Sequence, residues 1–123
     1  MTIDANIVIA YLSGDENVVE QLSEWRREGK SLFLPTVAES EVLSFSGWTL
    51  DERRGTEQFL AENFTSISFD RLIARIAASI RRSVRIKFPD AAIAATALFT
   101  RTPLVTRNAR DFRNVPALRV FVV

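Results

Sequence analysis

Short apolar segments alternate with longer segments of helical periodicity along the whole chain. The apolar segments predict β-strands at the start of the chain and at residues 31–36, 66–69, 103–106 and 118–123. Apolar residues at helical spacing predict helices through Tyr11, at residues 15–29, 37–45, 49–64 and 71–87, and from residue 90 onward. Residues 107–112 fit a turn or a short helix.

This alternation is typical of a parallel sheet between two layers of helices. We therefore expect an α/β fold, a three-layer sandwich with a short, mainly parallel central sheet covered by helices on both faces. Ligands of such folds collect beyond the carboxyl ends of the strands. Asp4 follows the first predicted strand, and Asp111 lies just beyond the strand at residues 103–106. Both acids are expected at this edge of the sheet.

The last long helix contains a single charged residue, Asp90. The stretch FPDAAIAATALF at residues 88–99 is otherwise typical of a helix buried on all sides. A carboxylate moved out of water is costly unless something pairs with it. Ala94 and Ala97 lie on the same face of the helix, and their small side chains would let other backbone approach the acid.

Residues 37–45 offer two carboxylates that the helical angle separates. Ala38, Val42 and Phe45 share one face, which is predicted to pack on the core, and Glu41 falls among them. Glu39 lies about 160° away around the helix. Glu41 is therefore the acid predicted to point toward the interior, and Phe45 is predicted to be a core residue.

Each acid also has a structural interpretation on its own. Asp4 and Asp90 could cap helices, Glu41 could be a half-exposed helix residue, and Asp111 could be a solvated turn residue. A shared site is the stronger hypothesis, because all four structural explanations would otherwise have to hold at once.

The composition narrows the chemistry of such a site. The 123-residue chain has neither cysteine nor histidine. This excludes disulfides, a cysteine nucleophile and the usual general base at neutral pH. Clustered carboxylates repel one another unless a cation neutralises them, and magnesium or manganese suits ligands of this kind. These ions activate water and stabilise the charge of a reacting phosphodiester.

The net charge of +1 conceals an uneven distribution. Residues 1–62 carry a net charge of −7 and residues 63–123 carry +8. A basic half of a chain suggests an anionic partner, of which nucleic acid is the commonest.

Four segments together resemble the PIN-domain family, in particular the VapC-type ribonuclease toxins of toxin–antitoxin pairs. They are IDANIVIAYL at the start, VAESEVL in the middle, FPDAAIAATAL, and LVTRNARDF near the end, in the family's order and spacing. The resemblance covers essentially the whole chain and implies a single PIN-like domain over residues 1–123. Ala5 stands where the family often has threonine or serine, and Ala38 stands where it often has threonine.

The resemblance implies a metal-dependent endoribonuclease that hydrolyses RNA phosphodiester bonds with one or two Mg²⁺ or Mn²⁺ ions. The catalytic and metal-binding residues that it implies are Asp4, Glu41, Asp90 and Asp111, with Asn6 and Thr106 arranging the site. It also implies an RNA substrate, a cognate antitoxin protein that holds the enzyme inactive, and a homodimer.

Arginines in the basic half are candidates for contacts with RNA or with the antitoxin. Arg71, Arg75, Arg82 and Arg85 share one face of the predicted helix at residues 71–87, and Arg107, Arg110 and Arg113 flank Asp111. The four on the helix could equally form a solvated face. Trp48 could line an apolar groove or a dimer face.

The start of the chain carries acids where a signal peptide would carry bases, and no apolar run is long enough for a bilayer, so a cytoplasmic protein is expected. Two other functions stay open. One is a PIN scaffold that binds RNA or protein without cleavage. The other is a small-molecule phosphohydrolase with Asp4 as a covalent nucleophile. The intact set of four acids favours the nuclease.

Overall fold

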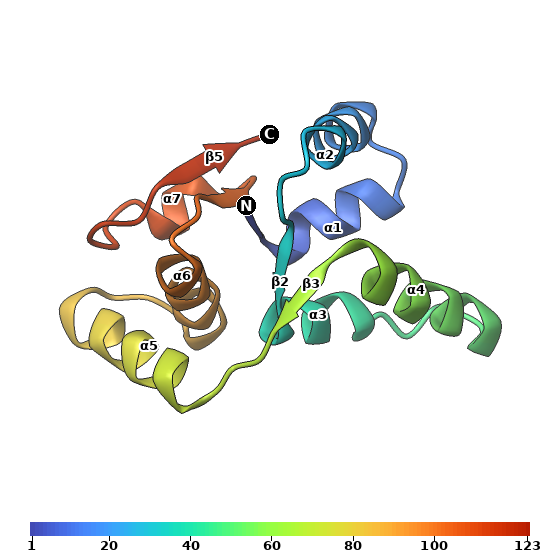
Figure 1. Ribbon diagram of the computed structural model, residues 1–123. Coiled ribbons are helices and arrows are strands. Elements are labelled where there is room, and N and C mark those ends of the chain that lie inside the picture. Colours follow the sequence, from blue (N-terminus) through green and yellow to red (C-terminus); the bar gives the residue numbers. More distant parts are fainter.

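The computed structural model describes all 123 residues as five strands and seven helices (Figure 1). The strands are β1 (Thr2–Ile3), β2 (Phe33–Pro35), β3 (Thr65–Ile67), β4 (Leu104–Thr106) and β5 (Val120–Val122). The helices are α1 (Ala5–Leu12), α2 (Glu16–Arg27), α3 (Thr36–Leu43), α4 (Leu50–Asn63), α5 (Arg71–Ser83), α6 (Phe88–Thr100) and α7 (Ala109–Phe112).

The five strands form one parallel sheet in the order β3-β2-β1-β4-β5. In Figure 1, α5 and α6 lie on one side of β2 and β3, whereas α1, α3 and α4 lie on the other. The predicted parallel sheet with helices on both faces is therefore confirmed. Since all strands are parallel, their carboxyl ends meet at one edge.

The core is a single cluster of 25 buried apolar residues, and α6 lies in its middle. Every residue of α6 from Ala91 to Ala97 is buried. This helix packs against α5 on one side and reaches β1, β2 and α3 on the other. Small side chains make this close packing possible, because a helix rich in alanine can approach several neighbours at once.

Polar side chains fix where several helices begin. The carboxylate of Asp15 accepts a hydrogen bond from Val18 N at the start of α2, and that of Asp70 accepts one from Ile73 N at the start of α5. Asp15 and Asp70 are therefore the N-cap residues of these helices. Gly29 (φ 75°) follows α2 in the left-handed conformation that commonly ends a helix.

The helix predicted at residues 71–87 ends earlier than expected. Helix α5 ends at Ser83 and not at residue 87, because Val84 takes an extended backbone (φ −137°, ψ 153°) that its β-branched side chain favours. Arg85 therefore lies outside the helix, and the prediction that it continues the arginine face of this helix is wrong.

The prediction of Phe45 as a core residue is also wrong. Helix α3 ends at Leu43, so Phe45 lies in the following loop with 59% of its surface exposed. Its ring packs edge-to-face on Trp48, with 5.2 Å between ring centroids. It also covers Gly47, where a Cβ atom would lie 2.5 Å from the ring, so only glycine fits without rearrangement.

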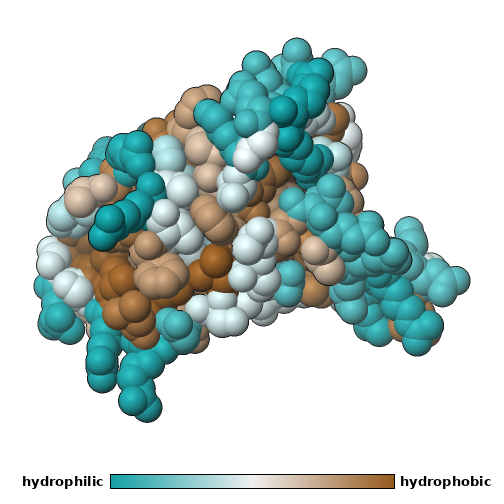
Figure 2. Space-filling model, viewed as in Figure 1, coloured by the Kyte–Doolittle hydropathy of each residue, from teal (hydrophilic) through white to brown (hydrophobic).

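Hydrophobic and hydrophilic side chains occupy different parts of the surface. Hydrophobic side chains gather between α5 and α6, whereas α2 and α4 are largely covered by hydrophilic ones (Figure 2). Leu72 of α5 and Phe88 of α6 are 53% and 45% exposed. None of the helices combines the length and the apolar character needed to cross a membrane.

Candidate active site

The carboxyl ends of the two central strands bring the first candidate residues together. Ile3 of β1 pairs with Val105 of β4, so Asp4 and Thr106 follow at the same edge of the sheet. The backbone N–H of Asp4 donates to the carbonyl of Val105 (3.0 Å), which extends the pairing by one residue. The side chain of Asp4 therefore starts from a rigid part of the fold.

Three hydrogen bonds hold the carboxylate of Asp4, which is only 6% exposed. Its Oδ1 accepts from the backbone N–H of Ala5 (2.7 Å), and Asp4 is thereby the N-cap of α1. Its Oδ2 accepts from the Thr106 hydroxyl (2.8 Å) and from Asn6 Nδ2 (3.2 Å). These bonds orient Asp4 even though residue 5 has no hydroxyl group.

Asn6 and Thr106 belong to a wider network around this carboxylate. Asn6 Nδ2 also donates to the Thr106 hydroxyl (3.2 Å), and Asn6 Oδ1 accepts from the backbone N–H of Arg107 (3.2 Å). The Thr106 hydroxyl accepts from the backbone N–H of Asn108 (3.0 Å). The network ties α1 to the loop after β4, and it places Asn6 and Thr106 beside Asp4.

Asp90 lies in the first turn of α6 without capping it, because Lys87 is the N-cap residue. Burial of its carboxyl group raises the pKa of Asp90, and the nearby charges of Asp4 and Asp111 raise it further, while Lys87 acts in the opposite direction. Asp90 thus lies within electrostatic reach of two other acids.

Glu41 faces the same region from α3. Its side chain is exposed overall, but partial burial of the carboxyl group, followed by the charges of Asp4 and Asp90, raises its pKa. Glu39 instead lines a hollow between α3 and α4 that also includes Leu60. The two glutamates therefore point to different parts of the molecule.

Burial also has the largest effect on Asp4. It raises the pKa of Asp4, and the charge of Asp111 adds to this, whereas the hydrogen bonds from Thr106, Ala5 and Asn6 act in the opposite direction. These repulsive effects between carboxylates link Asp4, Glu41, Asp90 and Asp111 into one acidic cluster.

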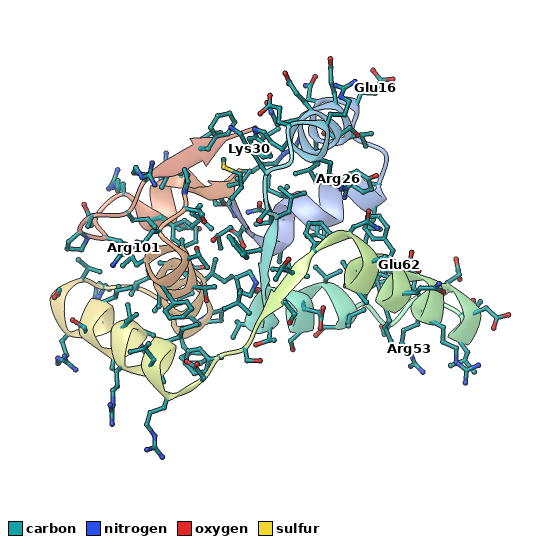
Figure 3. All side chains as sticks on the ribbon, in the orientation of Figure 1. Glu16, Arg26, Lys30, Arg53, Glu62 and Arg101 are labelled. Atoms are coloured by element: carbon teal, nitrogen blue, oxygen red, sulfur yellow. The ribbon has the colours of Figure 1, made fainter.

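No lysine or arginine forms an ion pair with a member of this acidic cluster. The ion pairs of the protein join Lys30 to Glu28, Arg53 to Glu57 and Arg107 to Asp15, and none includes a member of the cluster. Figure 3 shows Arg53 on α4, on the side of the molecule away from α6. Uncompensated carboxylate oxygens suit a hard divalent cation. No three of the acids converge closely enough to enclose a metal ion by themselves. This fits an ion held by one or two carboxylates together with water, as magnesium commonly is.

Three of the seven candidate arginines lie next to this cluster, and the others are in different situations. Arg107 is engaged with Asp15, with 2.7 Å between Nη2 and Oδ2, and so ties the loop after β4 to the start of α2. Arg85, Arg110 and Arg113 line a hollow next to Asp90 and Asp111. Arg82 lies outside this hollow, in a shallower depression beside it.

The sequence patterns missed two basic residues of the hollow, Arg81 and Lys87. Arg81 lies off the arginine face predicted for residues 71–87. The sequence pattern predicts Lys87 as the last residue of that helix. Its position three residues before Asp90 was the available signal.

An apolar groove of about 510 Å³ adjoins the acidic cluster on the side of Glu41. It is formed by the end of α1, the end of α3 and the loop that follows. Its apolar walls are Ile9, Leu12, Val42, Phe45 and Trp48. Trp48 thus lines an apolar groove, which is one of the two positions that the sequence suggested for it.

Comparisons with known proteins identify the family. The family model of the PIN domain matches residues 1–118. No curated protein sequence matches significantly.

Solved structures of high similarity come from toxin–antitoxin complexes. A toxin–antitoxin complex from Klebsiella pneumoniae contains a chain of 29% identity and TM-score 0.81, with 99% of this chain and 94% of that chain covered. VapBC2 from Rickettsia felis, bound to a DNA fragment from its promoter, has 18% identity, TM-score 0.84 and coverages of 99% and 97%. VapBC-1 from nontypeable Haemophilus influenzae has 18% identity, TM-score 0.80 and coverages of 98% and 96%. With the family model matching nearly its whole length, the chain belongs to the PIN domain family.

Proposed function

We propose that this protein is a metal-dependent endoribonuclease and the toxin of a toxin–antitoxin pair. The observation that carries this proposal is the acidic cluster at the carboxyl edge of the sheet, with four electrostatically connected carboxylates and no ion pair to a basic side chain. PIN domains are generally nucleases that use divalent metal ions, which agrees with this chemistry.

Asp4, Glu41, Asp90 and Asp111 would hold one or two Mg²⁺ or Mn²⁺ ions, with one or two carboxylates bound to each ion directly and the others acting through its water molecules. When bound, such ions activate water and stabilise the negative charge of the reacting phosphodiester. The protein's own contribution is orientation, because the hydrogen bonds from Ala5, Asn6 and Thr106 fix the carboxylate of Asp4 in one position. The raised pKa values are those of acids that lack a neutralising cation.

Protein partners are part of the proposal. The similar chain from Klebsiella pneumoniae was solved in a toxin–antitoxin complex, which supports a cognate antitoxin as partner. The apolar groove beside Glu41 has the composition of a protein-binding surface. The exposed side chains of Leu72 and Phe88 offer an apolar surface for a homodimer.

A cleavage assay with a matched control tests the nuclease. The wild-type protein should cut a mixed-sequence single-stranded RNA with Mg²⁺ or Mn²⁺ and stop in chelator. Asp90→Asn should abolish cleavage, whereas Asp51→Asn, which removes an exposed acid from the first turn of α4, should leave it unchanged. RNA binding without cleavage in either metal would contradict the nuclease and favour a binding module.

A growth assay tests the toxin role separately. Expression of the chain in a bacterial host should arrest growth, and co-expression of the protein encoded by the neighbouring upstream gene should restore it. Growth that is unaffected by an active nuclease would contradict the toxin role.

A further inference from the structure

A hollow of about 520 Å³ next to the acidic cluster collects much of the protein's unpaired positive charge. We call it the basic hollow, and its five basic side chains are Arg81, Arg85, Lys87, Arg110 and Arg113. They come from the end of α5, the loop between α5 and α6, α7 itself and the residue that follows it. Figure 1 shows the loop between α5 and α6 beside the segment that follows α7, although the two are distant in the sequence.

None of these five side chains forms an ion pair within the protein. By contrast, Lys30, Arg53 and Arg107 each have an acidic partner. Five like charges around one hollow repel one another, and this repulsion is relieved when an anion binds among them. No side chain caps the first turn of α6, so the amide groups at its start add to the positive potential beside Lys87.

The basic hollow and the acidic cluster share a wall. Asp90 and Asp111 belong to both, and Lys87 is close enough to Asp90 to lower its pKa. An anion in the hollow therefore lies immediately beside the acids. A polyanion could pass from the arginines onto the acidic cluster, where metal ions would neutralise its charge.

The walls of the hollow indicate which kind of polyanion binds. Apart from Val84, Ile86 and Val115, the lining is charged or polar. A protein segment normally needs aromatic or aliphatic anchors in its binding site, and the groove on the Glu41 side supplies those instead. Backbone phosphates need only cations, and arginine suits them through its planar set of donors.

We propose that the basic hollow binds backbone phosphates of the RNA strand on one side of the scissile bond, so that the strand crosses the acidic cluster from the α5–α6 loop toward Glu41. This inference rests on the proposed function for the identity of the strand. It adds Arg81 and Lys87 to the residues that contact substrate, and it gives the direction in which the RNA strand crosses the site.

The test is a binding measurement in chelator, where no cleavage interferes. The probe is a fluorescently labelled single-stranded RNA of twelve nucleotides, titrated at several salt concentrations. The test variant is Arg81→Ala/Arg85→Ala. The matched control is Arg27→Ala/Arg54→Ala, which removes two exposed arginines from α2 and α4 and gives the same net charge. Unchanged melting temperatures would establish that both variants are folded.

The test variant should bind the RNA at least about 10-fold more weakly at 0.1 M salt. The slope of log affinity against log salt should fall in magnitude by about 1.4, since each lost contact with a single strand contributes about 0.7. The control should differ from the wild type in neither quantity. Equal losses in the two variants would overturn the proposal, because they would show an effect of net charge alone.

Two further outcomes distinguish a failure of the basic hollow from a failure of the proposed nuclease function. A protein that cuts RNA while Arg81→Ala/Arg85→Ala binds it like the wild type would overturn the basic hollow and leave the nuclease intact. A protein that needs the hollow for binding but cuts no RNA would overturn the nuclease and support the hollow.

A polyglutamate peptide of equal charge that binds as well as the RNA, through the same two arginines, would overturn the assignment to phosphates.

Discussion

Asp90 is the only charged residue of α6, and its surroundings explain how a carboxylate is tolerated there. It lies in the first turn, beside Lys87, where the positive end of the helix stabilises an anion. Asp4 and Asp111 act in the opposite direction and raise its pKa together with burial. The balance favours a bound cation, because no arginine or lysine forms an ion pair with Asp90.

Glu41 and Glu39 provide a prediction in which one residue of the pair serves as control. Glu41→Gln should lower RNA cleavage by at least about 100-fold, since even an outer partner of a metal site contributes up to that factor. It should keep or slightly raise the stability of the metal-free protein, because it removes a charge that Asp4 and Asp90 repel.

Glu39→Gln should change neither quantity, because that side chain lies between α3 and α4. Cleavage assays in Mg²⁺ and melting curves in chelator measure both variants. Loss of activity in Glu39→Gln together with normal activity in Glu41→Gln would place the wrong glutamate in the site.

Single residues of the site were predictable where a regular element carries them. The helical angle separated Glu41 from Glu39 because α3 is regular at both positions, but Glu41 is exposed and does not point into the interior as predicted. The surroundings of Arg81 and Lys87 were not predictable in this way. They face the basic hollow only because the chain leaves the helix at Val84, and because α7 brings Arg110 to the same place. Sequence periodicity carries no information about such tertiary contacts.

At the scale of elements, the order of strands and helices could be predicted, and so could the ends that a boundary residue marks. Strand β2 and helix α2 have distinct periodicities and strong boundary residues, such as Pro35 and Asp15. The end of α5 lacks such a signal, since apolar and basic residues continue at helical spacing through Lys87. The extended backbone at Val84 reflects the need to start α6 in a new direction.

The alanines of α6 give a prediction about packing. Ala94 is fully buried, so Ala94→Leu should reduce the free energy of unfolding by about 1–3 kcal/mol through overpacking. Ala78→Leu, on the exposed face of α5, should stay within about 0.5 kcal/mol of the wild type. Urea unfolding in chelator measures both. Equal stability of the two variants would show that α6 is not closely packed against its neighbours.

At the scale of the whole molecule, the raised pKa values predict an unusual dependence of stability on pH. Asp4, Glu41 and Asp90 hold their protons more tightly in the folded than in the unfolded state. Without metal, their contribution to stability therefore rises as the pH falls through the raised pKa values toward the ordinary carboxyl range. Bound metal requires the ionised acids and should oppose this trend.

Melting curves at pH 7 and pH 5 check this dependence, with chelator and with Mn²⁺. As the pH falls from 7, the metal-free wild type should gain stability relative to Asp90→Asn, because only the wild type has the Asp90 carboxyl group whose pKa is raised. The added stability from Mn²⁺ should be larger at pH 7 than at pH 5. A metal-free wild type that gains no stability relative to Asp90→Asn as the pH falls would contradict the coupling between the acids.

Binding of divalent metal to the acidic cluster is tested most directly by metal-induced stabilisation. An ion present at about 100 times its dissociation constant stabilises the native state by about 2.7 kcal/mol. Melting curves with increasing Mg²⁺ or Mn²⁺ should therefore shift upward for the wild type and for Asp51→Asn alike, and much less for Asp90→Asn. Equal shifts in all three proteins would contradict the account, because the ion would then bind without the acidic cluster.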